Sequence, residues 1–166
     1  MLLKVWRFLT LLLAALALTM TSAHVLELPV KMRYDTQFYT AVNGSLYRYF
    51  ALVGAVYTLG SIITALVLVF LVRSRRPAFR WTLAGATCLL LAFGSWLVLV
   101  LPVNLEIAEV LRRVPGSAPA VWARLRPRWE YGHAAGFVLQ LSGFSALAVA
   151  IISETEGGHG ELHAAP

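Results

Sequence analysis

The sequence has a single cysteine, and charged residues make up only 13% of its 166 positions. Cys88 cannot form a disulfide within the chain, and its isolation excludes the oxidoreductases that work through a Cys-x-x-Cys pair. A strand-like alternation of apolar and polar residues with paired turns is also missing. The low charge and a hydrophobic content of 59% indicate a chain whose solvent is mostly lipid.

Four apolar windows, at about 6–28, 49–72, 81–103 and 132–152, are each long enough for a helix to cross a hydrocarbon core of roughly 30 Å. We therefore predict an all-α fold, a transmembrane four-helix up-down bundle that forms one domain over residues 1–152. The stretch "NLEIAEVLRRV" predicts a short amphipathic helix in the loop between the third and fourth helices. The Gly-rich polar segment 153–166 is expected to be a disordered tail.

The formal charge of +6 does not indicate nucleic-acid binding, because most basic residues flank the apolar windows. Six of them favour the cytoplasmic side by their position before the first window or in the short loop after the second. They are Lys4, Arg7, Arg73, Arg75, Arg76 and Arg80. We expect an integral protein of a bacterial inner membrane with both termini in the cytoplasm. The lipid bilayer is its expected partner, and the oligomeric state stays open.

The first window raises an alternative, because a basic start, an apolar core and small residues precede His24. This pattern resembles a signal peptide that is cleaved after Ala23. The apolar stretch continues past that point to Leu28, which favours an uncleaved membrane span. If cleavage did occur, His24 would become the N-terminal residue.

Polar residues gather where the bundle topology brings four helix ends together. The first window ends in "HVLELP", the third in "LPVNLE", and the fourth begins with "WEYGH". His24 and Glu27 are three residues apart, as are Glu130 and His133, so each pair lies on one helical face. Because the two helices are antiparallel, both histidines should lie about 4.5 Å deeper than their carboxylates. We predict that His24 and His133 face each other in a pocket.

Two kinds of chemistry fit these residues. Helical bundles hold metals through Glu-x-x-His pairs, which "EYGH" matches and "HVLE" mirrors. A transition metal such as iron or copper would then be bound by a set of imidazoles and carboxylates, namely His24, Glu27, Glu106, Glu130 and His133. The second window offers no carboxylate, so a mononuclear or incomplete site is as plausible. Alternatively, a histidine oriented by its glutamate removes a proton from the substrate without any metal.

Each carboxylate also has a purely structural interpretation. Glu130 stands in the first turn of a helix, where the helix dipole favours a negative charge. Glu109 is spaced to pair with Arg113 on the amphipathic helix. Glu27 is harder to explain, because it lies in the last turn of its helix, where the dipole disfavours it. We expect it to have a partner such as Arg48, a histidine or a metal.

The four windows, the histidine in "SAHVLELP", the "PVN" that closes the third helix and "RWEYGH" at the start of the fourth resemble the small membrane proteins grouped with fungal anthrone oxygenases. The resemblance covers residues 8 to 152. It implies oxygenation of a reduced polycyclic phenol, such as an anthrone, to a quinone with dioxygen. It points to His24, Asn104, Trp129 and His133 as catalytic residues. Where the family often has a further basic residue after the last histidine, this chain has 134–136 as Ala-Ala-Gly.

The predicted function is therefore an oxidoreductase or oxygenase that acts on an apolar aromatic or quinol-like molecule. Asn104 is expected to donate a hydrogen bond to an oxyanion. The alternative is a non-enzymatic membrane partner or assembly factor that binds a protein or a lipid headgroup through arginines of its basic loop, Arg112, Arg113, Arg124, Arg126 and Arg128. A transporter is disfavoured because the windows show no repeat and the middle of the bundle lacks charges.

Overall fold

The computed structural model describes residues 1–160, with side chains described for residues 1–154 other than Arg48. Its element order is α1 (Leu2–Lys31), α2 (Thr36–Leu46), α3 (Arg48–Leu71), α4 (Arg76–Ser95), the π-turn η1 (Trp96–Val100), α5 (Leu101–Arg113), the 3-10 turn η2 (Pro115–Ser117) and α6 (Ala118–Gly160). No strand occurs among these residues. The predicted all-α four-helix bundle is confirmed, and four helices are long and apolar enough to cross a membrane.

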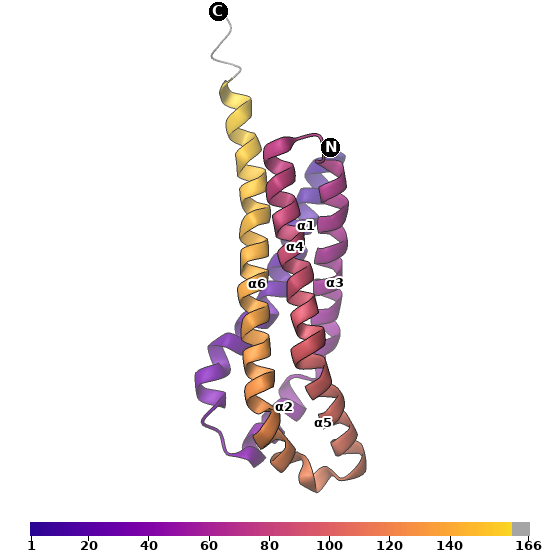
Figure 1. Cartoon of the computed structure of the whole chain (residues 1–166), viewed down its shortest axis with the longest axis vertical. Helices are drawn as coiled ribbons and strands as arrows, with labels where there is room; N and C mark the ends of the chain where they lie inside the picture. Colours follow the sequence, from indigo (N-terminus) through magenta and orange to yellow (C-terminus); the bar gives the residue numbers. More distant parts are fainter. Residues whose placement is uncertain (161–166) are drawn as a thin grey trace, which may run out of the picture.

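The long helices run side by side and alternate in direction (Figure 1). α4 packs on α6, α1 on α3 and α6, and α3 on α4. The chain begins at the end where the short turn joins α3 to α4, whereas α2 and α5 lie at the opposite end. The first and last long helices, α1 and α6, are longer than the predicted windows, because polar residues continue the helical hydrogen bonding beyond the apolar core. α6 starts at Ala118 rather than at residue 132, and α1 continues past Ala23 to Lys31.

The tail also differs from the expectation, since α6 continues through residues 153–160, which were predicted to be disordered. Residues 161–166 of the predicted tail lie outside the described residues. A second difference is α2, which no apolar window indicated. Its start is fixed by Asp35, whose side chain accepts a hydrogen bond of 2.8 Å from the backbone N–H of Phe38. Such a cap satisfies one of the free N–H groups of the first turn.

The predicted amphipathic helix exists as α5, but it continues α4 instead of standing in a separate loop. The π-turn η1 joins the two helices. Pro102 explains the irregularity, because it cannot donate a hydrogen bond to the Val98 carbonyl four residues earlier. Arg128 of α6 donates to that oxygen instead, at 2.7 Å from its Nη2 atom. Such π-turns often occur at functional sites.

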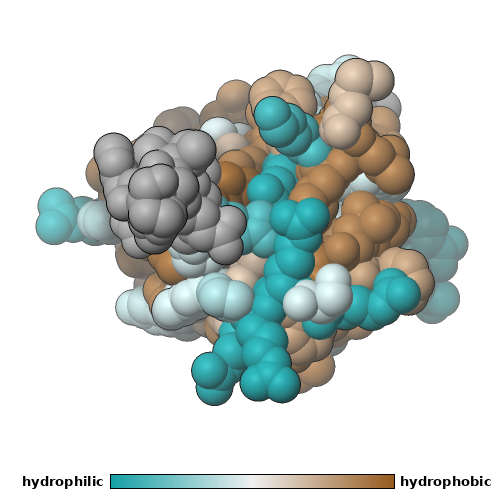
Figure 2. Space-filling model, turned by 90° about the horizontal axis from the view of Figure 1, so that it is seen from above, coloured by the Kyte–Doolittle hydropathy of each residue, from teal (hydrophilic) through white to brown (hydrophobic). Residues whose placement is uncertain are grey.

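The end of the bundle that holds the α3–α4 turn is polar. Seen from the end that holds the α3–α4 turn, hydrophilic side chains form a band across the apolar helices (Figure 2). Glu154 of α6 pairs there with Arg7 of α1 and, at 3.6 Å, with Arg75.

In the middle of the bundle, small residues let helices approach closely. A Cβ atom on Gly85 of α4 would lie 2.7 Å from Leu147 Cγ of α6. Contacts of this kind are typical of membrane bundles.

Candidate functional site

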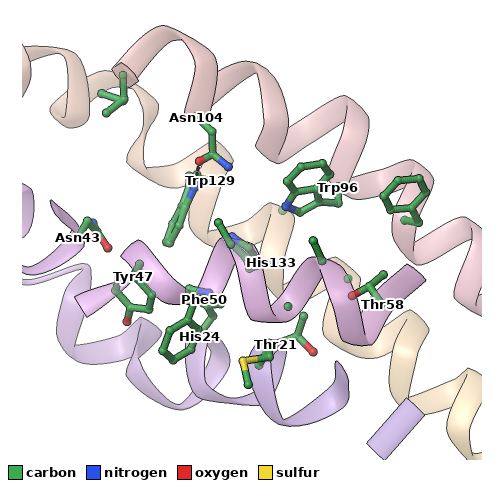
Figure 3. Close-up of a pocket in the computed structure, with 18 of the residues that line it drawn as sticks. Thr21, His24, Asn43, Tyr47, Phe50, Thr58, Trp96, Asn104, Trp129 and His133 are labelled. Carbon is green, nitrogen blue, oxygen red and sulfur yellow. Dashed lines mark hydrogen bonds between the residues drawn. The ribbon is translucent and has the colours of Figure 1, made fainter. Parts of the chain in front are cut away.

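Two histidines from antiparallel helices meet at the end of the bundle that carries α2 and α5. The rings of His24 on α1 and His133 on α6 are stacked, with centroids 4.0 Å apart and an angle of 19° between their planes (Figure 3). The predicted contact between these two residues is therefore present. Two positive charges at this separation repel strongly, so the pair can hold at most one extra proton.

Aromatic side chains surround the histidine pair. Tyr47 stacks on His24 from the side, with centroids 4.7 Å apart. The indole of Trp129 stands steeply to both imidazoles, with its ring centroid 5.0 Å from that of His24 and 4.4 Å from that of His133. Nδ1 of His24 and the hydroxyl of Tyr47 are buried and have no hydrogen-bond partner among the described residues. These atoms leave hydrogen-bonding capacity directed at the site, a costly arrangement in the absence of a ligand or water.

Asn104 of α5 orients Trp129. Its Oδ1 atom accepts a hydrogen bond of 2.8 Å from the indole Nε1 (Figure 3). Because that contact uses the amide oxygen, the amide nitrogen is left to serve as a donor. Trp96 is the first residue of the π-turn, and Asn104 follows the π-turn by four residues. Both side chains line the cavity next to the histidines. The structure thus brings together all four residues to which the family resemblance pointed.

These side chains line a cavity of about 690 Å³ whose walls are mainly apolar. Its lining comes from all six α-helices. Three residues of α3 at a spacing of four, Ala51, Ala55 and Leu59, line it and are also exposed, and so are Ala108 and Leu111 on α5. The mouth therefore opens between α3 and α5 through apolar side chains. An apolar rim within a membrane bundle is suited to a molecule that arrives from lipid.

Glu130 lies apart from the histidines in its contacts. Its Oε1 atom accepts a hydrogen bond of 2.7 Å from the Tyr39 hydroxyl and lies 2.8 Å from Nζ of Lys31. Glu130 is 0% exposed and Lys31 only 2% exposed. Tyr39 comes from α2, where burial and the Glu130 carboxylate raise the pKa of its phenol. The Lys31 ammonium also lies over the rings of Tyr47, at 4.4 Å, and Trp129, at 4.6 Å.

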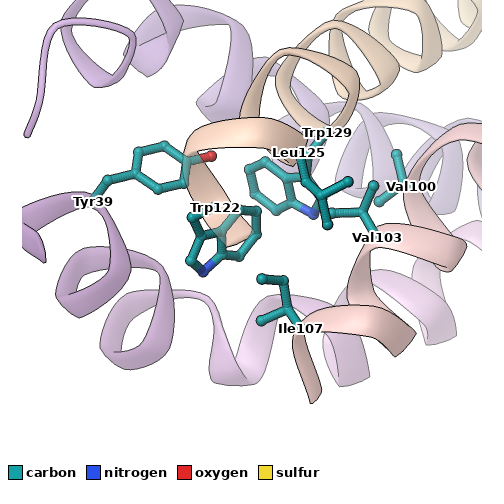
Figure 4. Close-up of a cluster of buried hydrophobic side chains, with 7 residues drawn as sticks. All are labelled: Tyr39, Val100, Val103, Ile107, Trp122, Leu125 and Trp129. Atoms are coloured by element: carbon teal, nitrogen blue, oxygen red, sulfur yellow. The ribbon is translucent and has the colours of Figure 1, made fainter. Parts of the chain in front are cut away.

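Tyr39 and Trp129 belong to a larger buried cluster that joins α2, η1, α5 and α6 (Figure 4). Its members are Tyr39, Val100, Val103, Ile107, Trp122, Leu125 and Trp129. The cluster holds the two peripheral helices against the start of α6. Trp129 therefore packs in this cluster and also contacts both histidines, so the cluster fixes the position of the indole beside the imidazole pair.

The predicted metal-binding set is not brought together. No group of three or more histidine, cysteine, aspartate or glutamate side chains within the described part of the chain is placed to hold a metal ion. Glu106 pairs with Arg124 on the outside, and Glu130 is occupied by Lys31 and Tyr39. Glu27 is 42% exposed. These carboxylates form ion pairs with Lys31 and Arg124, which the motif "Glu-x-x-His" does not include. The two histidines therefore contact each other without a carboxylate between them.

Lys31 is the residue that sequence reasoning missed. Glu27 was expected to need a partner, and the Lys31 ammonium lies 4.0 Å from it at helical spacing. That spacing was the available signal, because a cation four residues after a glutamate is a common helical partner. Of the partners that were expected for Glu27, Arg48 has a side chain outside the described ones. The predicted pair of Glu109 with Arg113 is present on α5.

The arginines of the basic loop are engaged within the chain. Arg126 is buried, and its Nη1 atom donates to the backbone carbonyl of Lys31 at the end of α1 and, at 2.8 Å, to that of Tyr34 in the segment before α2. Arg124 pairs with Glu106, and Arg128 donates to Val98. Arg112 and Arg113 both pair with Glu109. Arg124, Arg126 and Arg128 therefore link neighbouring elements, whereas Arg112 and Arg113 share one carboxylate within α5.

The fold and the cavity define the class of protein: an integral membrane four-helix bundle with an imidazole pair in the wall of an apolar cavity. Comparison with protein-family models, curated proteins and solved structures gives no match. The resemblance to the anthrone-oxygenase-like family thus stays a prediction that rests on the motifs of the sequence.

Proposed function

We propose that the protein is a membrane oxygenase that oxidises an apolar aromatic substrate, with the histidine pair as its proton acceptor. The observation that carries the proposal is the stacked His24–His133 pair in the wall of an apolar cavity of about 690 Å³. Cavities of this size bind small molecules, and an imidazole within reach of a substrate C–H or O–H acts as a general base.

The reaction is written for a substrate with a reactive CH2 group beside a phenol ring, as in an anthrone. One imidazole of the pair takes a proton from this carbon, and the resulting carbanion is stabilised as a phenolate-like anion. The amide nitrogen of Asn104 donates to its oxygen, since the amide oxygen is held by Trp129. Dioxygen is the oxidant: it gains the electrons of the carbanion and forms the new C–O bond.

The balance of the reaction is one CH2 group and one O2 giving one C=O group and one water. The two hydrogens leave the carbon as protons, and the second oxygen atom leaves as water. The imidazole pair holds one proton between the two steps and returns it to the leaving oxygen. The mainly apolar walls of the cavity, with Tyr47 and Trp129 beside the histidines, limit the water that can reprotonate the carbanion.

We further propose that the end with the α3–α4 turn faces the cytoplasm of a bacterial inner membrane. The dense arginines of that short turn support this orientation. The cavity would then lie near the non-cytoplasmic face, and the substrate would enter through the apolar mouth between α3 and α5.

The alternative, a non-enzymatic assembly factor that binds through the basic loop, has less support. Arg124 pairs with Glu106, and Arg126 and Arg128 are held by backbone carbonyls, so these three side chains are engaged in packing within the chain. Arg112 and Arg113 share the single carboxylate of Glu109, and a headgroup or an acidic protein would have to compete with it for them.

The test uses purified protein in lipid nanodiscs, with anthrone as the probe under air. Quinone formation and oxygen consumption are measured in the wild type, in His133→Phe and in His24→Phe. Both variants keep an aromatic ring in the stack, so we expect folding to be kept and the rate to fall by about 100-fold or more. Glu109→Gln, on the outside of α5, is the matched control and should keep the wild-type rate. Equal rates in all four proteins, or no rate above that of empty nanodiscs, would exclude the proposal.

A further inference from the structure

The cavity has a second polar end, which the proposed reaction does not use. Gln140 of α6 lines it and is 6% exposed. Its Oε1 atom accepts a hydrogen bond of 2.9 Å from the hydroxyl of Thr21 on α1. Thr21 and Thr58 lie on the side of the cavity away from Asn43 and Tyr47 (Figure 3). This polar end is therefore separate from the one formed by the histidines and Asn104.

The amide of Gln140 is oriented by its contact with Thr21. Because the oxygen faces the threonine hydroxyl, the nitrogen with its two N–H groups points elsewhere. No hydrogen bond from this nitrogen to another described residue is present. The amide nitrogen is thus available to a ligand oxygen in the cavity.

The spacing of the two polar ends follows from α6. His133 and Gln140 are seven residues apart, so they lie on the same face of the helix with a separation of about 10 Å along its axis. Gly136 lies between them and also lines the cavity. A Cβ atom on Gly136 would meet nothing within 4 Å, so the wall between the polar ends is open. Gly132 differs, because its Cβ would lie 2.9 Å from Val100 Cγ2 in the helix packing.

We infer that the cavity takes an elongated aromatic molecule with an oxygen at each end. One oxygen is bound beside the histidine pair and Asn104, and the other accepts a hydrogen bond from the amide nitrogen of Gln140. The apolar walls between these ends, which include Phe50, Phe93 and Trp96, contact the flat body of the molecule. This inference rests on the proposed function, because it specifies the substrate class of the same site.

The probes are three rods of similar shape: biphenyl, para-hydroxybiphenyl and para,para′-dihydroxybiphenyl. Their binding to the protein in nanodiscs is measured by quenching of tryptophan fluorescence, since Trp96 and Trp129 line the cavity. In the wild type, each added hydroxyl should tighten binding roughly five- to tenfold, which corresponds to one hydrogen bond. In Gln140→Leu the dihydroxy and monohydroxy probes should bind equally. In Gln140→Leu/His133→Phe the preference for the monohydroxy probe over biphenyl should also fall, because only His24 and Asn104 remain to bind its oxygen.

Three further variants complete the test. Thr21→Val removes the contact that orients the amide, so it should also reduce the preference for the dihydroxy probe. Gly136→Leu fills the open wall and should abolish binding of all three probes. Leu141→Ala, which changes a lipid-facing neighbour of Gln140, should change no affinity. Thermal unfolding of each variant shows whether it is folded, and Thr21→Val replaces Gln140→Leu if that variant does not fold.

The inference is overturned if Gln140→Leu weakens all three probes by the same factor, if the dihydroxy probe binds no tighter than the monohydroxy probe, or if none of the three binds. These outcomes are separate from failure of the proposed function. A protein that shows the stepwise affinities without oxidising anthrone retains the two-ended site and loses the oxygenase. A protein that oxidises anthrone but shows no step at Gln140 retains the oxygenase and loses the second polar end.

Discussion

Removing one member of the buried ion pair between Lys31 and Glu130 should destabilise the protein strongly. Nζ and Oε1 are 2.8 Å apart, and the side chains are 2% and 0% exposed. At an effective dielectric constant of about 20, the attraction at this distance is roughly 6 kcal/mol. Much of it offsets the cost of burying both charges, but Lys31→Met leaves the carboxylate with that cost and no cation. We expect this variant and Glu130→Gln each to lose about 3–5 kcal/mol of unfolding free energy.

The double variant Lys31→Met/Glu130→Gln removes both charges, and the amide oxygen introduced at position 130 can still accept the hydrogen bond from Tyr39. Its loss should therefore be smaller than the sum of the single losses by at least about 3 kcal/mol. Unfolding in mixed dodecyl maltoside and sodium dodecyl sulfate micelles, followed by tryptophan fluorescence, measures all three values. Arg112→Gln is the matched control, because its pair with Glu109 is 67% and 45% exposed and should contribute under about 1 kcal/mol. Additive losses, or single losses no larger than that of the control, would refute the reasoning.

Two further predictions concern packing and pH. Gly85→Ala should lower the unfolding free energy by about 1–3 kcal/mol in the same assay, because its Cβ would lie 2.7 Å from Leu147 Cγ. A Cβ at Gly94 would meet nothing within 4 Å, so Gly94→Ala should leave the unfolding free energy unchanged or raise it. Equal effects of the two substitutions would contradict the close packing at Gly85. The raised pKa of Tyr39 means that its stabilising contribution is complete below the unfolded pKa of about 10 and is lost as the pH rises through the folded value. Alkaline difference absorbance should therefore show at least one fewer ionising tyrosine in the wild type than in the unfolded chain, and Tyr39→Phe should reduce that difference by one; no change in Tyr39→Phe would argue against a buried phenol at this position.

The four membrane helices were predictable because each apolar window is about 20 residues or longer, which is the length that a helix needs to cross the hydrocarbon core of a bilayer. The contact of His24 with His133 was predictable as well, since an up-down bundle fixes which helix ends meet and the three-residue spacing fixes depth. Neither inference needed side-chain detail. Both follow from the helical rise and from the requirement that the backbone be satisfied within lipid.

The partners of the carboxylates were not predictable in the same way. Glu130 was expected beside the histidines or as a simple helix-start charge, yet it contacts Lys31 and Tyr39, which come from the end of α1 and from α2. No apolar window marks α2, so there was no reason in the sequence to expect Tyr39 beside Glu130. Choosing among possible cations for Glu27 and Glu130 depends on side-chain reach, which spacing along one helix does not provide.

The π-turn between α4 and α5 sets the helical phase of the site. Trp96 and Asn104 are eight residues apart, and in an uninterrupted α-helix they would be offset by about 80° around the axis. A π-turn takes one additional residue into a single turn, which removes roughly 100° and brings the two side chains to within about 20° of one face. Loss of one apolar residue from 97–100 would restore a regular α-helix in which the two side chains, then seven residues apart, keep an offset of about 20°. The deletion would therefore remove the π-turn and leave the helical phase of the site unchanged. Straightening the π-turn with every residue retained would instead turn Asn104 about 100° away from this face, so the π-turn is what allows a helix of this length to present both side chains to one cavity.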